Sequence, residues 1–250
     1  MEGTAAIQAA GPEMHRGVRV RQSVRHDAIM RLTARHMLSS HSTAAPVTMF
    51  GEADARNLVR TQKELAARPA GPKVTYSHLL LRLLASSLIR HPKMNAAFTD
   101  DTVNIYDEIN IGMAVTLPDG NLIVPVIRNA DVLTVDEIAI RATELMQRVR
   151  AGKHRLEDLQ GGTFTLSNVG MFPAVRFSTP LLNLPQVAIL GTGAIFERTV
   201  LSHGIGELQA VLDLSLTFDH RALNGFEASQ FVQTLADVIA DPRGPLGLRE

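Results

Sequence analysis

The sequence predicts a single α/β domain in which helices pack on a β-sheet, and three observations support this class. Segments with helical spacing of apolar residues are interspersed with short β-prone runs along the chain. The 250 residues, 45% of them hydrophobic, suffice for a sizeable core. No repeat and no Pro/Ala-rich linker interrupts the folded part. We therefore expect one domain over 20–250, preceded by a flexible arm or linker remnant over 1–19.

Five helices are predicted from apolar spacing and boundary residues. The segment 77–90 is the most uniformly apolar, so this helix should be largely buried behind the sheet and end at His91-Pro92. The helix over 134–149 opens with Thr134 and Glu137, the spacing of a capping box. The remaining helices are expected at 25–40, 52–67 and 226–239.

The predicted strands lie between these helices. The run 208–218 is the clearest, because its apolar residues partly alternate and a turn-forming Asn-Gly pair follows. A shorter strand begins near Thr163 and breaks at Ser167-Asn168 into a glycine-containing loop. Further strands are expected at 47–50, within 102–127 around a turn at 118–121, and at 187–190.

Bulk composition excludes several classes of function. The 25 basic and 25 acidic side chains cancel, so the chain offers no overall basic footprint for nucleic acid or anionic membranes. It has no cysteine, which excludes disulfides, Cys-ligated metals and a thiol nucleophile. The nine histidines show no ligand spacing with acidic residues, so no metal is expected. No apolar run or basic start suggests a membrane span or secretory signal, and we expect a cytoplasmic or organelle-matrix protein.

Two strand ends carry candidate chemistry. His220 follows the strand 208–218, and Asn224 stands four residues later in the motif Asp219–Gly225. Imidazole is the side chain that titrates nearest neutrality, so a histidine held at a sheet edge can act as a general base. Taken alone, this pattern is more often a capped strand end followed by a turn. Ser167, at the other break, presents a hydroxyl that either satisfies its own turn or contacts a ligand.

Together, these segments resemble a known family. The segments 161–172 and 219–225 are similar to the catalytic domain of the acyltransferase subunits of 2-oxoacid dehydrogenase complexes. The segments 109–115, 120–128 and 185–191 also resemble that family, in the same order, so that the resemblance covers about Val20 to Asp241. A collinear match of several motifs is far more specific than any one of them.

The resemblance implies a chloramphenicol-acetyltransferase-like two-layer sandwich, with a mixed sheet and packed helices. It also implies an activity, the transfer of an acyl group between dihydrolipoamide and coenzyme A. His220 would then be the general base that activates the thiol, and Ser167 would stabilise the tetrahedral oxyanion. Residues that contact coenzyme A are not identified by the sequence.

Asn224 departs from the commoner family pattern, which has Asp at this position. An amide can orient a neighbour by hydrogen bonding but cannot stabilise an imidazolium by charge, so we expect Asn224 to be a positioning residue. Asp219 and Arg221 flank the histidine, and we expect them to form structural salt bridges rather than to touch substrate.

The resemblance further implies an assembly. Family members form obligate trimers with active sites at subunit interfaces, so His220 and Ser167 are expected to come from neighbouring chains. Some build cubic 24-chain or icosahedral 60-chain cores. The C-terminal segment 242–250 is a poor apolar anchor, which favours a lone trimer. Expected partners are the dehydrogenase and lipoamide dehydrogenase subunits, or a separate lipoylated protein, because no lipoyl or subunit-binding module is recognised in this sequence.

Two alternatives remain open at this point. The first is a non-catalytic scaffold that keeps the fold and assembles partner subunits without turnover, although the retained His220 and Ser167 favour an enzyme. The second is the transfer of acyl groups from coenzyme A to another small acceptor with the same base. The acyl group itself (acetyl, succinyl or branched) is not readable, since one methylene changes discrimination by only about 1–3 kcal/mol.

Overall fold

The computed structural model describes residues 14–117, 120–202 and 205–248. The helices are α1 (Ala28–Thr43), α2 (Arg56–Ala66), α3 (Tyr76–Arg90), α4 (Val135–Arg150) and α5 (Gly225–Ala240), with short 3-10 turns at Pro92–Met94 and Leu156–Asp158. The strands are β1 (Met14–His15), β2 (Val18–Arg19), β3 (Pro46–Asp54), β4 (Ala96–Thr99), β5 (Thr102–Ile105), β6 (Ile111–Met113), β7 (Val115–Thr116), β8 (Leu122–Ile123), β9 (Val126–Ile127), β10 (Phe164–Asn168), β11 (Ala188–Thr192), β12 (Phe196–Ser202) and β13 (Ile205–Asp219).

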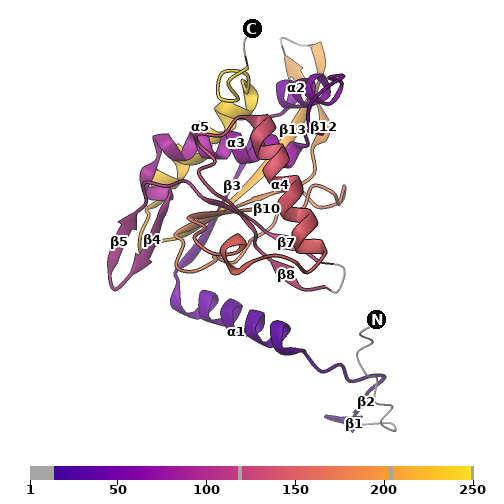
Figure 1. The fold of residues 1–250 in the computed structure, drawn as a ribbon, viewed down its shortest axis with the longest axis vertical. Helices are drawn as coiled ribbons and strands as arrows, with labels where there is room; N and C mark the ends of the chain where they lie inside the picture. Colours follow the sequence, from indigo (N-terminus) through magenta and orange to yellow (C-terminus); the bar gives the residue numbers. More distant parts are fainter. Residues whose placement is uncertain (1–13, 118–119, 203–204, 249–250) are drawn as a thin grey trace.

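One mixed sheet organises the domain. Its strand order is β12-β13-β11-β10-β6-β9, and β3 also pairs with β13. β10 runs parallel to β11 and to β6, whereas β3, β11 and β12 are each antiparallel to β13. The helix α5 packs on β3 and β13, and α3 packs against α4 and α5 (Figure 1). The fold is therefore the two-layer α/β arrangement with a mixed sheet that the sequence predicts.

The strand β13 has two different buried faces. Leu212, Leu214, Leu216 and Phe218 belong to the main hydrophobic core, together with residues of α5. The alternate positions carry polar side chains that are equally buried: Asp213, Ser215, Thr217 and Asp219. Because successive strand residues point to opposite faces, one face of β13 meets the helices and the other meets polar partners.

Those polar partners come partly from the loop between β10 and β11. Arg176 donates from Nε to Asp213 Oδ2 at 2.6 Å, and its guanidinium lies 3.6 Å from the ring centroid of Phe196. The backbone N–H of Ser178 donates to Ser215 Oγ at 3.3 Å. The second face of the sheet is thus covered in part by the loop that follows Ser167.

The predicted helices and strands are largely confirmed, with informative exceptions. α3 is buried as expected, and Thr134 and Glu137 form the capping box of α4. The prediction of a helix from residue 52 is wrong at its start: residues 52–54 belong to β3, which pairs with β13 along its whole length, and α2 begins at Arg56. The strand β12 was not predicted.

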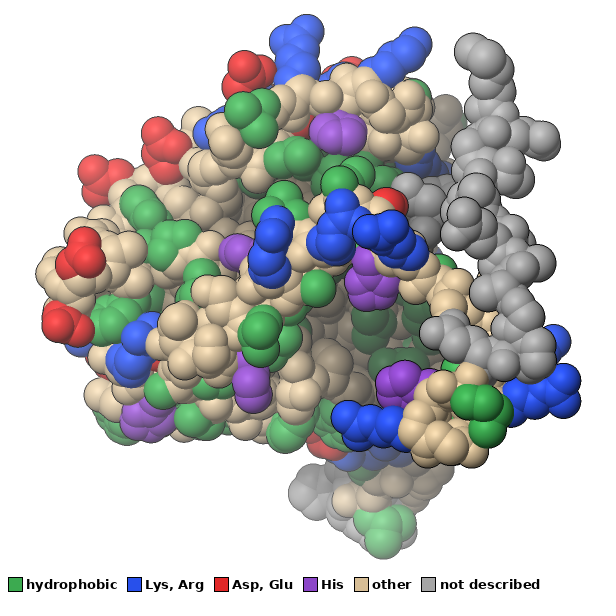
Figure 2. All heavy atoms as spheres, turned by 90° about the horizontal axis from the view of Figure 1, so that it is seen from below, with side chains coloured by type: hydrophobic (Ala, Val, Ile, Leu, Met, Phe, Trp, Pro, Cys, Tyr) green, Lys and Arg blue, Asp and Glu red, His purple; other side chains and the backbone are tan. Residues whose placement is uncertain are grey.

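The N-terminal segment lies outside the layer of helices that covers the sheet, and Ser40 Oγ joins it to the domain by donating to Leu182 O at 2.7 Å. Residues 1–13 of the predicted arm lie outside the described residues, and residues 14–19 form the two-stranded pair β1-β2 instead of an irregular segment. α1 is separate from the helices that cover the sheet (Figure 1). Six arginines and one acidic side chain occur between residues 14 and 45, and Figure 2, seen from this side, has Lys, Arg and His side chains around a hollow. In the described part of the chain, no helix is long and apolar enough to cross a membrane.

Candidate active site

Ser167 lies at the end of a central strand. It is the fourth residue of β10, pairs in register with Gly191 of β11, and is half-buried. A cavity of about 560 Å³ opens in front of it, with a mainly apolar lining that includes Met113, Val115 and Phe172. A hydroxyl in this position is shielded from bulk water on several sides, as an oxyanion donor must be.

His78 also lines this cavity, but its ring is already engaged. His78 Nδ1 accepts a hydrogen bond from the backbone N–H of Thr75 at 3.2 Å, as part of the N-terminal cap of α3. Burial lowers the pKa of His78, so the imidazole is neutral near pH 7. We assign His78 a structural role.

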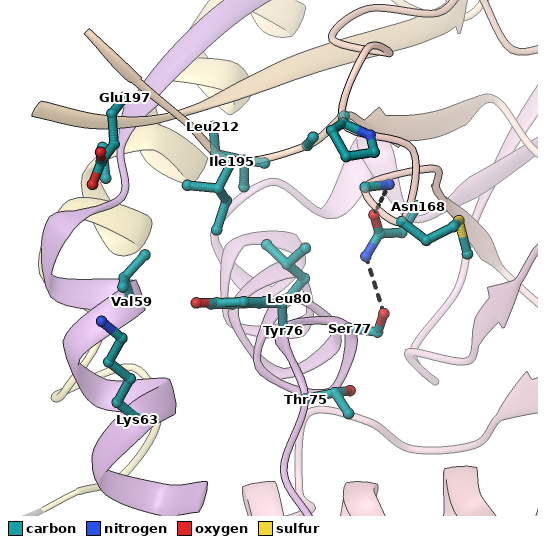
Figure 3. Close-up of a pocket in the computed structure, with 16 residues that line it drawn as sticks. Val59, Lys63, Thr75, Tyr76, Ser77, Leu80, Asn168, Ile195, Glu197 and Leu212 are labelled. Atoms are coloured by element: carbon teal, nitrogen blue, oxygen red, sulfur yellow. Dashed lines mark hydrogen bonds between the residues drawn. The ribbon is translucent and has the colours of Figure 1, made fainter.

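A second cavity, of about 800 Å³, adjoins the first. Val59 and Lys63 of α2 face Tyr76 and Leu80 of α3 across it (Figure 3). Burial raises the pKa of Tyr76, so its phenol keeps its proton at neutral pH and can donate a hydrogen bond. Four residues line both cavities: Thr75, Ser77, Asn168 and Met171. The two spaces therefore meet beside Ser167.

His220 occupies a very different position. It directly follows β13, is exposed, and is held by its backbone N–H, which donates to Ala45 O at 2.9 Å. Its ring packs at 5.6 Å from that of Phe218, and no hydrogen bond of the imidazole is made within the described residues. The backbone is fixed, while the imidazole remains open to a partner from outside the chain.

The neighbours of His220 pair with each other, as expected. Arg221 donates from Nε and Nη2 to the carboxylate of Asp219, at distances of 2.6–3.1 Å, and lies 4.6 Å from the ring centroid of Phe98. Burial acts to raise the pKa of Asp219, but hydrogen bonds from Arg221 and from the backbone N–H of Ala45 outweigh it and lower the pKa. This ion pair braces the chain on both sides of His220.

Asn224 caps a helix in the single chain. Its Oδ1 accepts from the backbone N–H of Glu227 at 2.9 Å, and Glu227 Oε2 accepts from Asn224 N at 3.0 Å. The residue is thus the N-cap of α5 in a complete capping box. Within the described residues, no hydrogen bond joins the side chain of Asn224 to His220.

Ser167 and His220 are not brought together within one chain. Ser167 is level with Gly191 and Ser215, two strands away, and His220 lies five residues beyond Ser215. With strand spacings of about 4.8 Å and a rise of about 3.3 Å per residue, the two residues are roughly 15–20 Å apart. A single substrate carbonyl cannot meet both from the same chain.

Sequence reasoning did not identify the two cavities or the contacts around Asn168. The cavity walls come from α2, α3, α4 and the loop after β10, and only the helical faces of these segments hinted at burial. Asn168 itself was visible in the Ser-Asn motif, without its partner. Within the described ranges, no group of three or more His, Asp or Glu side chains could hold a metal ion.

Comparison with known proteins agrees with the fold and with the motifs. Residues 19–246 match the model of the family "2-oxoacid dehydrogenases acyltransferase (catalytic domain)". The dihydrolipoyllysine-residue succinyltransferase component of the mitochondrial 2-oxoglutarate dehydrogenase complex of Homo sapiens is 34% identical over 245 residues, which cover 96% of this chain and 54% of that protein. The chain thus spans about half the length of the curated relatives it matches.

Solved structures give the same result. The dihydrolipoamide acetyltransferase of Azotobacter vinelandii, studied for the role of a serine, a histidine and an asparagine in its catalytic mechanism, matches with a TM-score of 0.85 at 33% identity, over 90% of this chain and 93% of that one. The cubic core of a pyruvate dehydrogenase multienzyme complex matches equally well. Chloramphenicol acetyltransferase, at 13% identity and a TM-score of 0.50 over 82% of this chain and 94% of its own, shares the fold. By this match along nearly its whole length, the chain belongs to the family of 2-oxoacid dehydrogenase acyltransferases and comprises their catalytic domain.

Proposed function

We propose that this chain transfers an acyl group between the thiol of a dihydrolipoyl group and that of coenzyme A. The observation that carries the proposal is that the fold of this family presents a half-buried Ser167 at one strand end and an exposed His220 at another. In the Azotobacter relative the catalytic histidine and asparagine are four residues apart, the spacing of His220 and Asn224. This spacing supports the same residue roles here.

The reaction is a thioester exchange without net oxidation. His220 accepts the thiol proton as the sulfur attacks the thioester carbonyl carbon, and a new C–S bond forms. The hydroxyl of Ser167 donates to the developing oxyanion. Collapse of the tetrahedral adduct breaks the other C–S bond, and the imidazolium returns the proton to the leaving thiolate.

The two cavities suggest where the two thiol substrates bind, because the smaller is lined by Ser167 and the larger adjoins it at Asn168. Both are open, and they converge beside Ser167 from different sides of α3. The larger one carries Lys63 at its rim and a mainly apolar floor, which suits an extended arm that ends in phosphates. We assign it to coenzyme A, and the smaller cavity to the dihydrolipoyl arm.

The separation of roughly 15–20 Å within one chain requires a second chain to complete the site. We infer a trimer in which His220 of one subunit faces Ser167 of the next. The cubic core among the matched structures makes a larger assembly a natural extension, with dehydrogenase and lipoamide dehydrogenase subunits or a separate lipoylated protein as partners. The relatives include a succinyltransferase and acetyltransferases, so both acyl groups are candidates.

The proposal is tested by acyl transfer from acetyl-, succinyl- and isobutyryl-coenzyme A to free dihydrolipoamide. The wild type should be active with one or more donors, and the rate should fall by up to about 10,000-fold in His220→Ala and about 100- to 1,000-fold in Ser167→Ala. Both variants should keep the wild-type oligomer by light scattering. A wild type inactive with every donor would favour a scaffold or a different acceptor.

A further inference from the structure

Asn168, the residue after the proposed oxyanion donor, is held at both ends of its side-chain amide. Asn168 Nδ2 donates to Ser77 Oγ at 3.0 Å, and Asn168 Oδ1 accepts from the backbone N–H of Gly170 at 2.8 Å (Figure 3). One amide thus joins the end of β10 to the first turn of α3 and to its own loop.

The loop that Asn168 holds is closely packed at two glycines. A Cβ on Gly170 would lie 2.8 Å from Gly193 O and 2.9 Å from Asn168 Oδ1. A Cβ on Gly193 would collide with the carbonyl of Arg176. The backbone N–H of Val169 also donates to Thr192 O, which continues the pairing of β10 with β11 past the strand end. The backbone segments at Gly170, Gly193 and Arg176 are therefore closely packed beside the Asn168 amide.

Ser167 and Asn168 point to opposite faces of the sheet, because they are consecutive strand residues. Asn168 is directed toward the helix layer and Ser77, so it cannot hold the serine hydroxyl directly. It fixes the backbone from which that hydroxyl projects, at the place where the two cavities meet. A shift of about 1 Å in a reacting group can cost about 100-fold in rate.

We propose that Asn168 is a positioning residue for Ser167, acting through its two hydrogen bonds to Ser77 and Gly170. The proposal rests on the acyltransferase function described above. It separates two roles within one dipeptide: the hydroxyl of the first residue stabilises the oxyanion, and the amide of the second sets where that hydroxyl stands.

A double-mutant cycle tests this role. Asn168→Ala should lower kcat by about 10- to 100-fold, with a much smaller change in KM. In the Ser167→Ala background the same change should have almost no further effect, because a positioning residue acts only through the group it positions. Asn168→Asp keeps the acceptor for Gly170 N and should retain more activity, and Ser77→Ala should cost less than Asn168→Ala.

The matched control is Asn104→Ala. Asn104 Nδ2 donates to a hydroxyl, Thr99 Oγ1, at 2.9 Å, the same kind of bond on the β4-β5 hairpin and outside both cavities. This variant should keep wild-type kcat. Additive losses in the Ser167→Ala/Asn168→Ala variant would overturn the proposal, since Asn168 would then act on substrate independently, and so would a loss confined to KM.

A second measurement separates this proposal from the proposed function. Amide hydrogen exchange over residues 164–172 should speed up in Asn168→Ala and not in Asn104→Ala, whether or not the chain has activity. If the wild type transfers no acyl group, the proposed function fails, and unchanged exchange in Asn168→Ala would then show that Asn168 does not hold the segment either.

Discussion

The ends of β10 and β13 place the two candidate catalytic side chains under opposite conditions. At the end of β10, Ser167 is half-buried at the wall of one cavity, and Asn168 beside it is held by hydrogen bonds to Ser77 and Gly170. At the end of β13, His220 is exposed, and only its backbone and its neighbours are held. One chain therefore holds Ser167 at the wall of its own cavity and exposes the imidazole of His220 at its surface.

The largest expected effect concerns whether Ser167 and His220 act from different chains, and mixed oligomers test it. His220→Ala and Ser167→Ala chains, each almost inactive alone, should recover about a third of the wild-type activity in trimers that contain both chains, because one of the three sites in every mixed trimer combines two intact residues from different chains. Acyl transfer by oligomers purified through two different tags measures this. Mixed oligomers that stay inactive would place both residues of a site in one chain.

The next largest effect is expected at the ion pair of Asp219 and Arg221 beside His220. Asp219→Asn should cost about 2 kcal/mol of stability, since the buried carboxylate receives several charge-assisted hydrogen bonds. It should also lower kcat, because the strand end that carries His220 loosens. Thermal unfolding at fixed protein concentration and acyl transfer report the two effects.

A matched control lies on β3. Asp54 and Arg56 form the same kind of fork two residues apart, but at an exposed position. Asp54→Asn should cost less than about 1 kcal/mol and leave kcat unchanged. Equal losses in the two variants would show that the Asp219 pair has no special connection with His220.

The ion pair of Asp219 and Arg221 also predicts that the stability of the fold depends on pH. The pKa of Asp219 is lowered in the folded chain. At pH values just below the ordinary carboxyl pKa, the folded state therefore binds fewer protons than the unfolded state. Its contribution to stability is present above about pH 4 and is lost as the pH falls through the folded pKa. Urea unfolding between pH 3 and pH 6 should show a steeper loss of stability toward acid pH in wild type than in Asp219→Asn. Parallel curves would contradict this sign.

The smallest effect is expected at Asn224. Asn224→Ala should cost about 1 kcal/mol through loss of the α5 cap, whereas Asn224→Asp should be nearly neutral, because both residues are good N-caps. Thermal unfolding distinguishes the two variants. If Asn224→Asp kept its stability and lost activity, the amide would also act on the chemistry of an assembled site, as the sequence suggested.

The sequence predicted the parts of the molecule that depend on local pattern. The apolar run of α3, the Thr134 capping box and the alternation in β13 each carry their own signal. The start of α2 was misplaced because the pairing of β3 with β13 overrides a helical pattern at residues 52–54. Ser167 and His220 were found as strand ends within motifs. Asn168 and Ser77 stand 91 residues apart, so their bond exists only once the chain has folded.

The two differently lined faces of β13 connect folding with the position of His220, the proposed general base. A slip of one residue in its pairing would bring Asp213, Ser215, Thr217 and Asp219 against the helices and turn four apolar side chains toward Arg176 and Ser178. Such a chain would bury uncompensated polar groups and would be strongly disfavoured. Since His220 follows this strand directly, any molecule that reaches the native state has already placed its histidine correctly. Errors in the position of His220 are therefore removed during folding.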